Sequence, residues 1–483
     1  MTHTTTHSDQ DYEKVITEKL GDAQLRTNLR SAMDTLIHKR KDLLTSRFPE
    51  WETLRTMGQN AKLKVLAQLD TYVQRFEENA TKNGFVVHYA STAKDANDII
   101  YNLAKERGVT RILKGKSMAS EEIGFNQYMK EKGIIAKETD LGELIIQLID
   151  EHPVHIVVPA IHKNRHQVGK IFQEKLSAPL ESEPEKLNGI AREHMRTEFE
   201  GFKMGLSGVN FAIANEGAIW LVENEGNGRM CTTACDIHVA ICGIEKMVES
   251  FEDASILNNL LCPSAVGVPI TCYQNIITGP RQEDELDGPK EAHIILLDHN
   301  RSNILADEKY YRALSCIRCG TCLNHCPVYD KIGGHAYLAT YPGPIGVVIT
   351  PQLFGLDNYE HIANLCSLCG RCGEVCPVKI PLPELIRDLR CEKAHEGRGV
   401  VRGYKDAKHN KWEELGMKAF AKLASNGVAW RAFLTINGWL APLGKWVGRY
   451  TPVLKKWLKH RDMPAVHANL HAQVKALAGV VYE

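Results

Sequence analysis

Short apolar runs alternate with amphipathic segments from about residue 60 to about residue 300. Apolar side chains recur at helical spacing between residues 62 and 79, at Leu66, Leu69, Val73 and Phe76, which predicts a helix. Strands are predicted where apolar residues run together, at 85–87, 110–113, 133–136 and 155–158. Strands separated by helices in this way indicate a mostly parallel sheet that is covered on both faces.

A second group of predicted strands lies at 210–214, 218–222, 238–242 and 293–297. Closer spacing favours the antiparallel part of a mixed sheet for this group. After Arg312 the strand pattern stops, and residues 382–391 form an amphipathic helical pattern. We therefore predict four parts: an N-terminal helical segment (1–60), an α/β domain (61–305), a cysteine-rich helical domain (306–395) and a C-terminal extension (396–483).

Composition and charge narrow the class of protein only a little. The hydrophobic fraction of 43% and the charged fraction of 24% are typical of a globular protein. Lysine plus arginine equals aspartate plus glutamate at 59 each, so the overall charge gives no indication of a nucleic-acid partner. The N-terminus lacks a secretory pattern and no apolar stretch is long enough to cross a bilayer, so we expect a cytoplasmic protein. In a reducing compartment the fourteen cysteines are better candidates for metal ligands than for disulfides.

Eight cysteines fall in two runs with the same spacing, C-x2-C-x2-C-x3-C-P. The first run spans 316–327 and the second spans 366–377. Three thiolates two residues apart can hold three corners of a four-iron, four-sulfur cubane, and the fourth cysteine of such a run ligates the other cluster in two-cluster ferredoxins. We predict one 4Fe-4S cluster on Cys316, Cys319, Cys322 and Cys376, and a second on Cys366, Cys369, Cys372 and Cys326.

Zinc is the alternative occupant of these cysteines. Structural zinc usually takes pairs of cysteines from two separate knuckles, which two repeated four-cysteine runs do not resemble. Two clusters that exchange ligands lie close together, so the pattern favours an electron relay. Arg318 and Arg371 lie inside the runs. They place positive charge beside a cluster or point to solvent, and the sequence does not decide between the two.

The C-terminal extension is basic and rich in tryptophan. Thirteen lysines and arginines stand against three acidic residues between Arg402 and Arg461, a local charge of +10. Five of the seven tryptophans lie here, at Trp412, Trp430, Trp439, Trp446 and Trp457. Tryptophan beside lysine is typical of helices that dock on a partner or on a membrane surface. We favour a partner protein, with the inner face of the membrane as the alternative and ordinary packed helices as a third interpretation.

The chain resembles the lactate utilisation protein B family over nearly its full length. The resemblance rests on segments that occur in the family's order: 114–122 (KGKSMASEE), 138–148 (ETDLGELIIQL), 159–163 (PAIHK), 222–227 (VENEGN), 333–337 (GGHAY), 341–346 (YPGPIG) and both cysteine runs. It implies an α/β lactate-utilisation domain with a mixed sheet, similar to sugar isomerases and coenzyme-A transferases. A helical two-cluster ferredoxin domain and a helical extension would follow.

The resemblance also implies a function. Family members are iron–sulfur subunits that act with two partner proteins in the oxidation of L-lactate to pyruvate, so we expect two clusters that pass electrons to a respiratory, quinone-linked acceptor. One alternative is that the N-terminal domain itself binds and oxidises a small 2-hydroxy acid, with the clusters as electron sink. No G-x-G-x-x-G fingerprint for a flavin or nicotinamide supports it. A scaffold with structural clusters is the third possibility.

Polar residues at the ends of predicted strands suggest a pocket in the first domain, where open α/β sheets place ligands. The candidates are Lys114, Lys116, Ser117, His162, Lys163, Glu223 and Asn224. Lysine and histidine suit a small carboxylate, and Glu223 could take a proton. The same residues also fit a helix start and a turn, and the sequence leaves both interpretations open.

Overall fold

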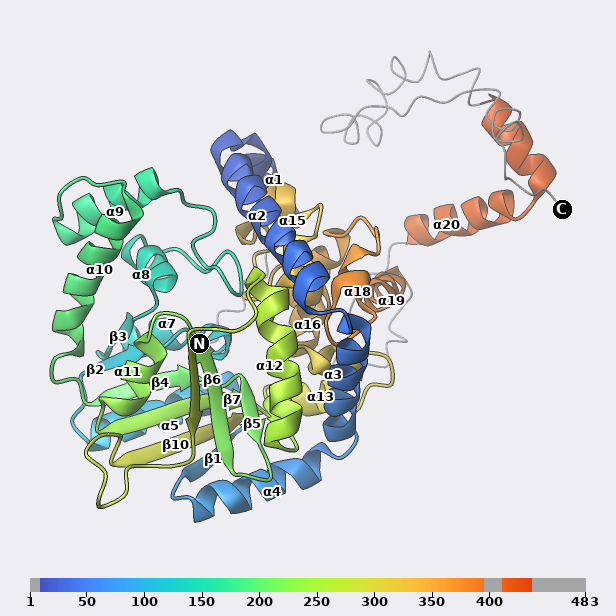
Figure 1. Cartoon of the computed structure of the whole chain (residues 1–483). Coiled ribbons are helices and arrows are strands. Elements are labelled where there is room, and N and C mark those ends of the chain that lie inside the picture. Colours follow the sequence, from blue (N-terminus) through green and yellow to red (C-terminus); the bar gives the residue numbers. More distant parts are fainter. Residues whose placement is uncertain (1–8, 395–410, 437–483) are drawn as a thin grey trace. The chain divides into compact units, whose positions relative to one another are not determined.

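The computed structural model describes residues 9–394 and 411–436 (Figure 1). Four helices open the chain: α1 (Asp9–Gly21), α2 (Ala23–Arg47), α3 (Trp51–Leu66) and α4 (Leu69–Lys82). Helix α2 begins where the Asp22 side chain accepts a hydrogen bond from the amide of Leu25 at 2.8 Å, which satisfies one of the free donors of the first turn.

A six-stranded parallel sheet forms the centre of the α/β part. Its order is β1 (Val86–Ala90), β10 (Glu291–Leu297), β7 (Ile237–Gly243), β4 (Met204–Gly208), β2 (Arg111–Lys114) and β3 (Ile135–Glu138). Along β7 the side chains alternate between two cores: Val239 and Ile241 face one, with α5 (Ala93–Glu106), whereas Ala240 and Cys242 face the other, with α4. Both faces of the sheet are therefore buried, as parallel sheets require.

A second sheet, with four strands, is mixed, and its first strand follows β4 along the chain. Its order is β8 (Met247–Val248), β5 (Phe211–Ile213), β6 (Ala218–Glu223) and β9 (Tyr273–Ile277). Helix α12 (Phe251–Val266) packs against β5 and β8, and also against α2 and α3. Residues at the ends of β4, β6 and β7 line one cavity together with Arg318 and Tyr341 of the cysteine-rich part.

After β10 the described residues contain no strand. The main helices of this part are α13 (Arg301–Leu305), α14 (Thr321–Asn324), α15 (Tyr329–Ile332), α16 (Gly343–Phe354), α18 (Arg371–Val375) and α19 (Leu382–Ala394). Figure 1 shows α2 and α12 between them and the sheets. One core joins Leu29 of α2, Ile156, Leu257 of α12, Val348 of α16 and Ile386 of α19. Residues 9–394 thus pack as one compact unit, and the predicted boundary near 305 stays a prediction.

The predicted α/β class with a mixed sheet, followed by a helical cysteine-rich part, is confirmed. The helix predicted at 62–79 is interrupted at Ala67 and Gln68, so that α3 and α4 are separate helices. The prediction that β7 and β10 are antiparallel is wrong: they pair parallel, and the long connection through α12 and β9 makes this possible.

The strand predicted at 155–158 does not form. The ring of His155 accepts hydrogen bonds from the amides of Val157 and Val158 at 3.0 and 3.1 Å, so these donors are not available to a sheet. The other ring nitrogen lies 3.1 Å from Oδ1 of Asn324 in α14. The apolar run is buried against the cysteine-rich part instead.

Residues 411–436 form a separate unit with α20 (Lys411–Ala424). The Trp430 ring stacks on Phe433 and meets Phe420 edge-on. Trp439, Trp446 and Trp457 lie outside the described residues.

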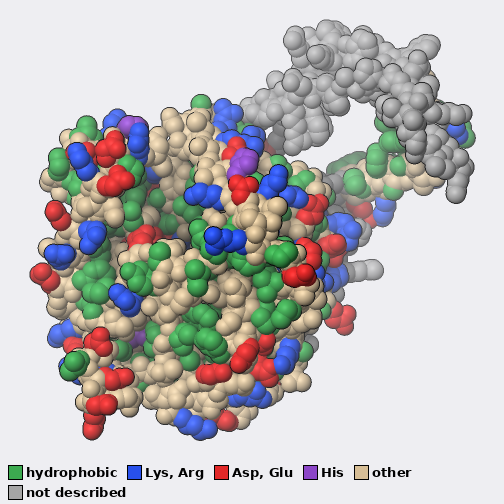
Figure 2. Space-filling model, in the orientation of Figure 1, with side chains coloured by type: hydrophobic (Ala, Val, Ile, Leu, Met, Phe, Trp, Pro, Cys, Tyr) green, Lys and Arg blue, Asp and Glu red, His purple; other side chains and the backbone are tan. Residues whose placement is uncertain are grey.

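No helix of the described part is both long and apolar enough to cross a membrane. On the face drawn in Figure 2, basic and acidic side chains are interspersed.

Candidate functional site

Four cysteines from both runs line one cavity. Cys316, Cys319 and Cys322 come from the first run, and Cys376 is the last cysteine of the second. The rest of the wall is mostly apolar and includes Ile156, Ile317, Ile345, Val378, Ile380 and Leu382. Three of the four thiols are buried, and only Cys316 is partly exposed. A group held here is well shielded from water.

The other four cysteines line a second cavity, which is nearer the surface. Cys326 comes from the first run, and Cys366, Cys369 and Cys372 come from the second. Cys369 is exposed, and the adjoining Leu368 has 43% of its surface exposed. Each cavity therefore takes its fourth cysteine from the other run, the arrangement that two-cluster ferredoxins use.

The two runs fold alike in detail. Arg318 and Leu368, each just before the second cysteine of its run, have φ angles of 61° and 55°. Their amides donate to the sulfur of the first cysteine, at 3.4 Å to Cys316 and 3.2 Å to Cys366. The glycines after the second cysteines, Gly320 and Gly370, have φ angles of 73° and 83°, which glycine adopts without strain. The loops are thus wound around their thiols.

The fourth cysteine of each run also accepts a backbone hydrogen bond. The amide of Tyr329 donates to Cys326 at 3.5 Å, and that of Ile380 donates to Cys376 at 3.3 Å. Donors aimed at a thiolate stabilise its negative charge and tune the potential of a cluster bound to it. The donor set therefore fits two 4Fe-4S clusters: eight sulfur ligands, and amides that already point at half of them.

Burial raises the pKa of Cys372 to about 12 and the pKa of both Cys326 and Cys376 to about 11. A buried thiolate loses its hydration, so without a metal the neutral thiol is favoured at pH 7. Iron binding must displace these protons, and cluster assembly is coupled to their release.

The two arginines of the runs behave differently. Arg318 is buried, with 9% of its side chain exposed; its Nη2 lies 3.2 Å from Oε1 of Glu245, and its guanidinium lies 4.8 Å from the ring centroid of Tyr341. Arg371 is 53% exposed and pairs with Glu374 at 2.6 Å. Arg318 therefore places its charge inside the protein beside the first cysteine run, and Arg371 points to solvent.

A larger cavity of about 390 Å³ adjoins the buried cysteine cavity, and Ile156 lines both. Four of the predicted pocket residues line it: Lys116, Ser117, Glu223 and Asn224. They come from the N-terminal end of α6 (Met118–Glu122) and from the end of β6, so the sheet edge does gather them as expected. Their ligand role stays a prediction.

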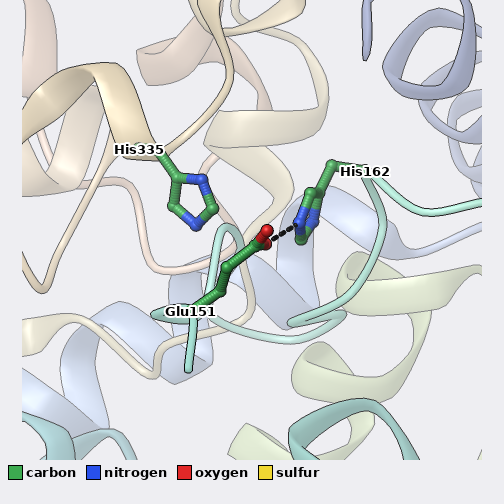
Figure 3. Close-up of side chains that lie close together, drawn as sticks. All are labelled: Glu151, His162 and His335. Atoms are coloured by element: carbon green, nitrogen blue, oxygen red, sulfur yellow. Dashed lines mark hydrogen bonds and ion pairs between the residues drawn. The ribbon is translucent and has the colours of Figure 1, made fainter. Parts of the chain in front are cut away.

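His162 and Lys163 lie elsewhere, around Glu151. Figure 3 shows Glu151 with His162 and His335. Glu151 Oε2 lies 2.6 Å from Nε2 of His162, and Lys163 Nζ donates to Oε1 at 2.7 Å. Burial opposes ionisation of Glu151, but these two contacts outweigh it and lower its pKa to about 2. His335 stands beside His162, with ring centroids 5.1 Å apart. The Lys163 ammonium already neutralises this carboxylate, so the group fits a structural contact better than a metal site.

Lys114 is the last residue of β2, is fully buried, and is not among the residues that line the large cavity. Its ammonium lies 2.9 Å from Glu121 and 2.5 Å from Glu138. Glu143 lies in the same group, and its pKa is raised to about 8 by burial and by the charge of Glu138. Lys114 therefore balances buried carboxylates rather than facing a ligand.

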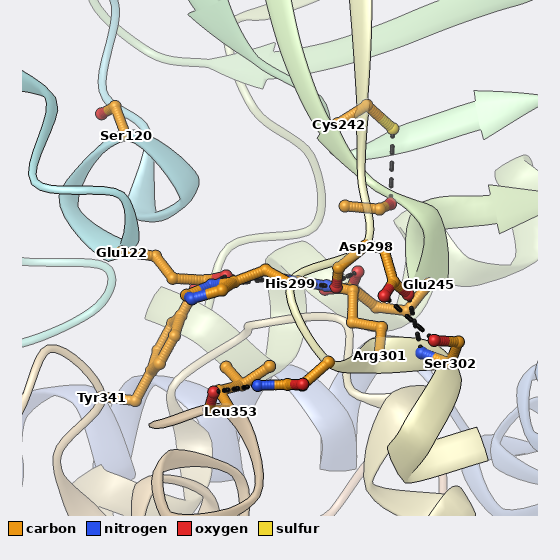
Figure 4. A network of polar contacts seen from close by, with 12 residues as sticks. Ser120, Glu122, Cys242, Glu245, Asp298, His299, Arg301, Ser302, Tyr341 and Leu353 are labelled. Atoms are coloured by element: carbon orange, nitrogen blue, oxygen red, sulfur yellow. Dashed lines mark hydrogen bonds and ion pairs between the residues drawn. The ribbon is translucent and has the colours of Figure 1, made fainter. Parts of the chain in front are cut away.

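A buried network forms the wall between the sheet edge and the cysteine-rich part (Figure 4). The guanidinium of Arg301 binds both carboxylate oxygens of Glu122 at 2.8 Å and also contacts Glu245 through Nε. The Tyr341 hydroxyl donates to Glu122 at 2.6 Å, and His299 lies 2.8 Å from the same carboxylate. Through Arg301, the network holds Glu245 in place, and Glu245 is the ion-pair partner of Arg318.

Comparisons with known proteins agree with this arrangement. The LUD domain family matches residues 73–297, the 4Fe-4S dicluster domain matches residues 312–380, and the family "Lactate utilisation protein B, C-terminal" matches residues 388–480. The Lactate utilization protein B of Shouchella clausii is 38% identical over 463 residues, which cover 95% of each chain. The chain belongs to the lactate utilisation protein B family.

Other relatives extend the family. The Lactate utilization protein B of Oceanobacillus iheyensis is 40% identical over 86% of this chain and 85% of its own. The Escherichia coli K12 protein named "Uncharacterized electron transport protein YkgF" is 37% identical over 95% and 94%. A crystal structure of a DUF162 family protein from Deinococcus radiodurans covers 47% of this chain and 98% of its own at 15% identity, with a TM-score of 0.27, too low to support an argument.

Lys246, Arg318 and Tyr341 also line the cavity and were not among the predicted pocket residues. The sequence could have indicated Arg318, because this residue lies inside a cysteine run. It could also have indicated Tyr341, which belongs to one of the segments shared with the family. It could not have indicated Lys246, because only the fold brings the end of β7 beside the first cysteine run.

Proposed function

We propose that this chain is the iron–sulfur electron-transfer subunit of a multi-subunit system that oxidises L-lactate to pyruvate. One observation carries the proposal: the two four-cysteine cavities, of which one is buried and the other reaches the surface. The names of the relatives, lactate utilisation protein B and electron transport protein, support it.

In this proposal Cys316, Cys319, Cys322 and Cys376 hold the buried 4Fe-4S cluster (cluster 1). Cys366, Cys369, Cys372 and Cys326 hold the cluster near the surface (cluster 2). The clusters supply one-electron redox chemistry. The protein holds them close together, because each run contributes to both, and it surrounds cluster 1 with apolar side chains.

The family suggests the partners, and the exposure of the second cysteine cavity suggests where one of them docks. Two further lactate-utilisation subunits would act with this chain, one of them oxidising the hydroxy acid, and Leu368 and Cys369 mark the surface where electrons pass between cluster 2 and a partner. Electrons then reach a respiratory, quinone-linked acceptor. The basic extension would dock on a partner in the cytoplasm, or on the inner face of the membrane.

Anaerobic purification followed by reductive titration tests the proposal. We expect about eight iron and eight sulfide per chain and reversible uptake of two electrons, one by each cluster. Zinc in place of iron would refute the electron-transfer role. Clusters that cannot be reduced would favour a scaffold.

A second candidate function has support from the large cavity beside cluster 1. The α/β part itself would bind and oxidise a 2-hydroxy acid, with the two clusters taking one electron each. Lactate added to the isolated, oxidised chain would then bleach the clusters. The leading proposal expects no bleaching without the partner subunits.

A further inference from the structure

In the lining of the cavity of about 390 Å³, the acidic side chains have hydrogen-bond partners, whereas some donors of the basic side chains lack them among the described residues. The acidic residues at the end of β6 are already bound: the amides of Gly228 and Arg229 donate to Glu223 at 2.6 and 2.7 Å, and the Asn275 amide donates at 2.8 Å. The amide of Leu141 donates to Glu225 at 3.0 Å. These carboxylates have little need of a cation from a ligand.

The basic residues of the lining near the first cysteine run have fewer acidic partners than they have positive charges. Glu245 is the one carboxylate on that side of the lining, and it is shared between Arg301 and Arg318. The Nη1 atom of Arg318 is buried and makes no hydrogen bond with any described residue. Lys246, half-buried beside it, makes no ion pair within the described part of the chain.

A buried guanidinium with a free donor is costly unless a partner arrives, because its N–H group has lost water and gained nothing. The planar fork of arginine matches the two oxygens of a carboxylate, and a neighbouring ammonium adds charge. We infer that Arg318 and Lys246 form the binding site for the carboxylate of an organic acid that occupies the large cavity.

The rest of the lining indicates the body of this acid. Leu221, Val222, Leu261 and Val266 provide apolar walls. The volume falls in the range of roughly 300–1,000 Å³ that is usual for small-molecule sites, so it has room for apolar atoms beyond a carboxylate. The ligand class is a carboxylate with an apolar body.

The position of the site ties it to cluster 1. Arg318 lies between Cys316 and Cys319, and Ile156 lines both cavities. A bound carboxylate therefore places negative charge next to the cluster, which disfavours the addition of an electron. This coupling rests on the proposed function, whereas the binding site itself does not.

Linear monocarboxylates from acetate to octanoate, together with lactate and pyruvate, are the probes. Titration calorimetry on the anaerobic, cluster-loaded full chain measures their affinity, and 1-octanol is the control without a carboxylate. We expect affinity to rise with chain length and 1-octanol to bind at least tenfold more weakly than octanoate. Equal binding of the alcohol and the acid would overturn the inference, as would the absence of saturable binding by every acid.

Variants locate the site. Lys246→Met and Arg318→Lys should each weaken octanoate binding by about ten- to a hundredfold, the loss expected for one charge-assisted hydrogen bond. Arg371→Met removes an exposed arginine of the second cysteine run and should leave the affinity unchanged. If Lys246→Met and Arg318→Lys both bind octanoate like the unaltered chain, the carboxylate is held elsewhere and the inference fails.

The midpoint potential of cluster 1 gives a second readout. Saturating octanoate should shift it to a more negative value in the unaltered chain and shift it less in Lys246→Met. Normal, reducible clusters with a potential that octanoate leaves unchanged would overturn the inference and leave the electron-transfer proposal intact. Absence of reducible clusters would instead refute the proposed function, while the calorimetric titration would still test the site.

Discussion

The Nη2 atom of Arg318 lies 3.2 Å from Oε1 of Glu245, and this ion pair joins the first cysteine run to the end of strand β7. Both side chains are almost completely buried, at 9% and 1% exposure. The same carboxylate also contacts Arg301, which is held by Glu122 as well. The loop of the first cysteine run is thereby fixed to the α/β part through a buried ion pair.

Replacing Glu245 by Gln should destabilise the protein strongly. The change leaves the buried guanidinium of Arg318 without its carboxylate partner, whereas Arg301 keeps Glu122. Breaking one partner of a buried pair costs about 3–5 kcal/mol. Thermal unfolding of the cluster-loaded protein would measure it. The matched control is Glu374→Gln, which breaks the exposed pair with Arg371 and should cost about 0–1 kcal/mol. Equal effects of the two changes would contradict the structural role of Glu245.

Exchange of the fourth cysteine between the runs can be tested with paired substitutions. Cys326 and Cys366 line the same cavity, so Cys326→Ala combined with Cys366→Ala should lose one cluster, about four iron atoms, and keep the other. Cys316→Ala combined with Cys326→Ala lies within one run but affects both cavities, and should lose about eight. Iron and sulfide analysis with EPR of the reduced proteins gives the count. The reverse result would mean that each run holds its own cluster.

Glu143 predicts a dependence of stability on pH. Its pKa in the folded protein, about 8, exceeds its ordinary value of 4.5, so the folded state holds a proton that the unfolded state releases between these values. Stability must therefore fall as the pH rises from about 4.5 to about 8. Glu143→Gln removes this loss, and the variant should unfold at a higher temperature than the unaltered protein at pH 9 and at a similar temperature at pH 5.

The control for this experiment is Glu131→Gln, an exposed residue of α7 (Phe125–Glu131). It should not change the pH profile. A Glu143→Gln protein whose unfolding temperature follows the unaltered protein at every pH would show that Glu143 does not titrate in this range.

The grouping of the eight cysteines around two cavities could be predicted from the sequence, because it depends on local spacing. Their role as cluster ligands stays a prediction. Spacing within eleven residues determines which thiols can meet, and the repeated run determines the exchange, so the grouping of Cys376 with Cys316 could be predicted without a fold. Most strands of the α/β part were also found, since each is a short apolar run. Their order was not, because β7 and β10 look the same in sequence whether they pair parallel or antiparallel.

The lining of the large cavity could be predicted only in part, because it depends on the order of the strands. Lys116 and Glu223 follow strands and were found, whereas Lys246 enters the cavity because β7 lies between β4 and β10. His162 and Lys163 follow a run that looked like a strand, but His155 binds the amides of that run and directs it toward the cysteine-rich part. Such a competition between a side chain and a sheet for the same donors has no sequence signature.

The single core that joins α2, residues 154–156, α12 and the helices after residue 310 has a consequence for synthesis. Ribosomes deliver the N-terminal elements first, so the surface that holds the first cysteine loop can begin to form before the cysteines leave the exit tunnel. Iron–sulfur assembly enzymes would then meet a nascent chain that is already half folded. A ferredoxin module cut from residue 306 onward would lack that support and should arrive at the same enzymes as an unstructured peptide.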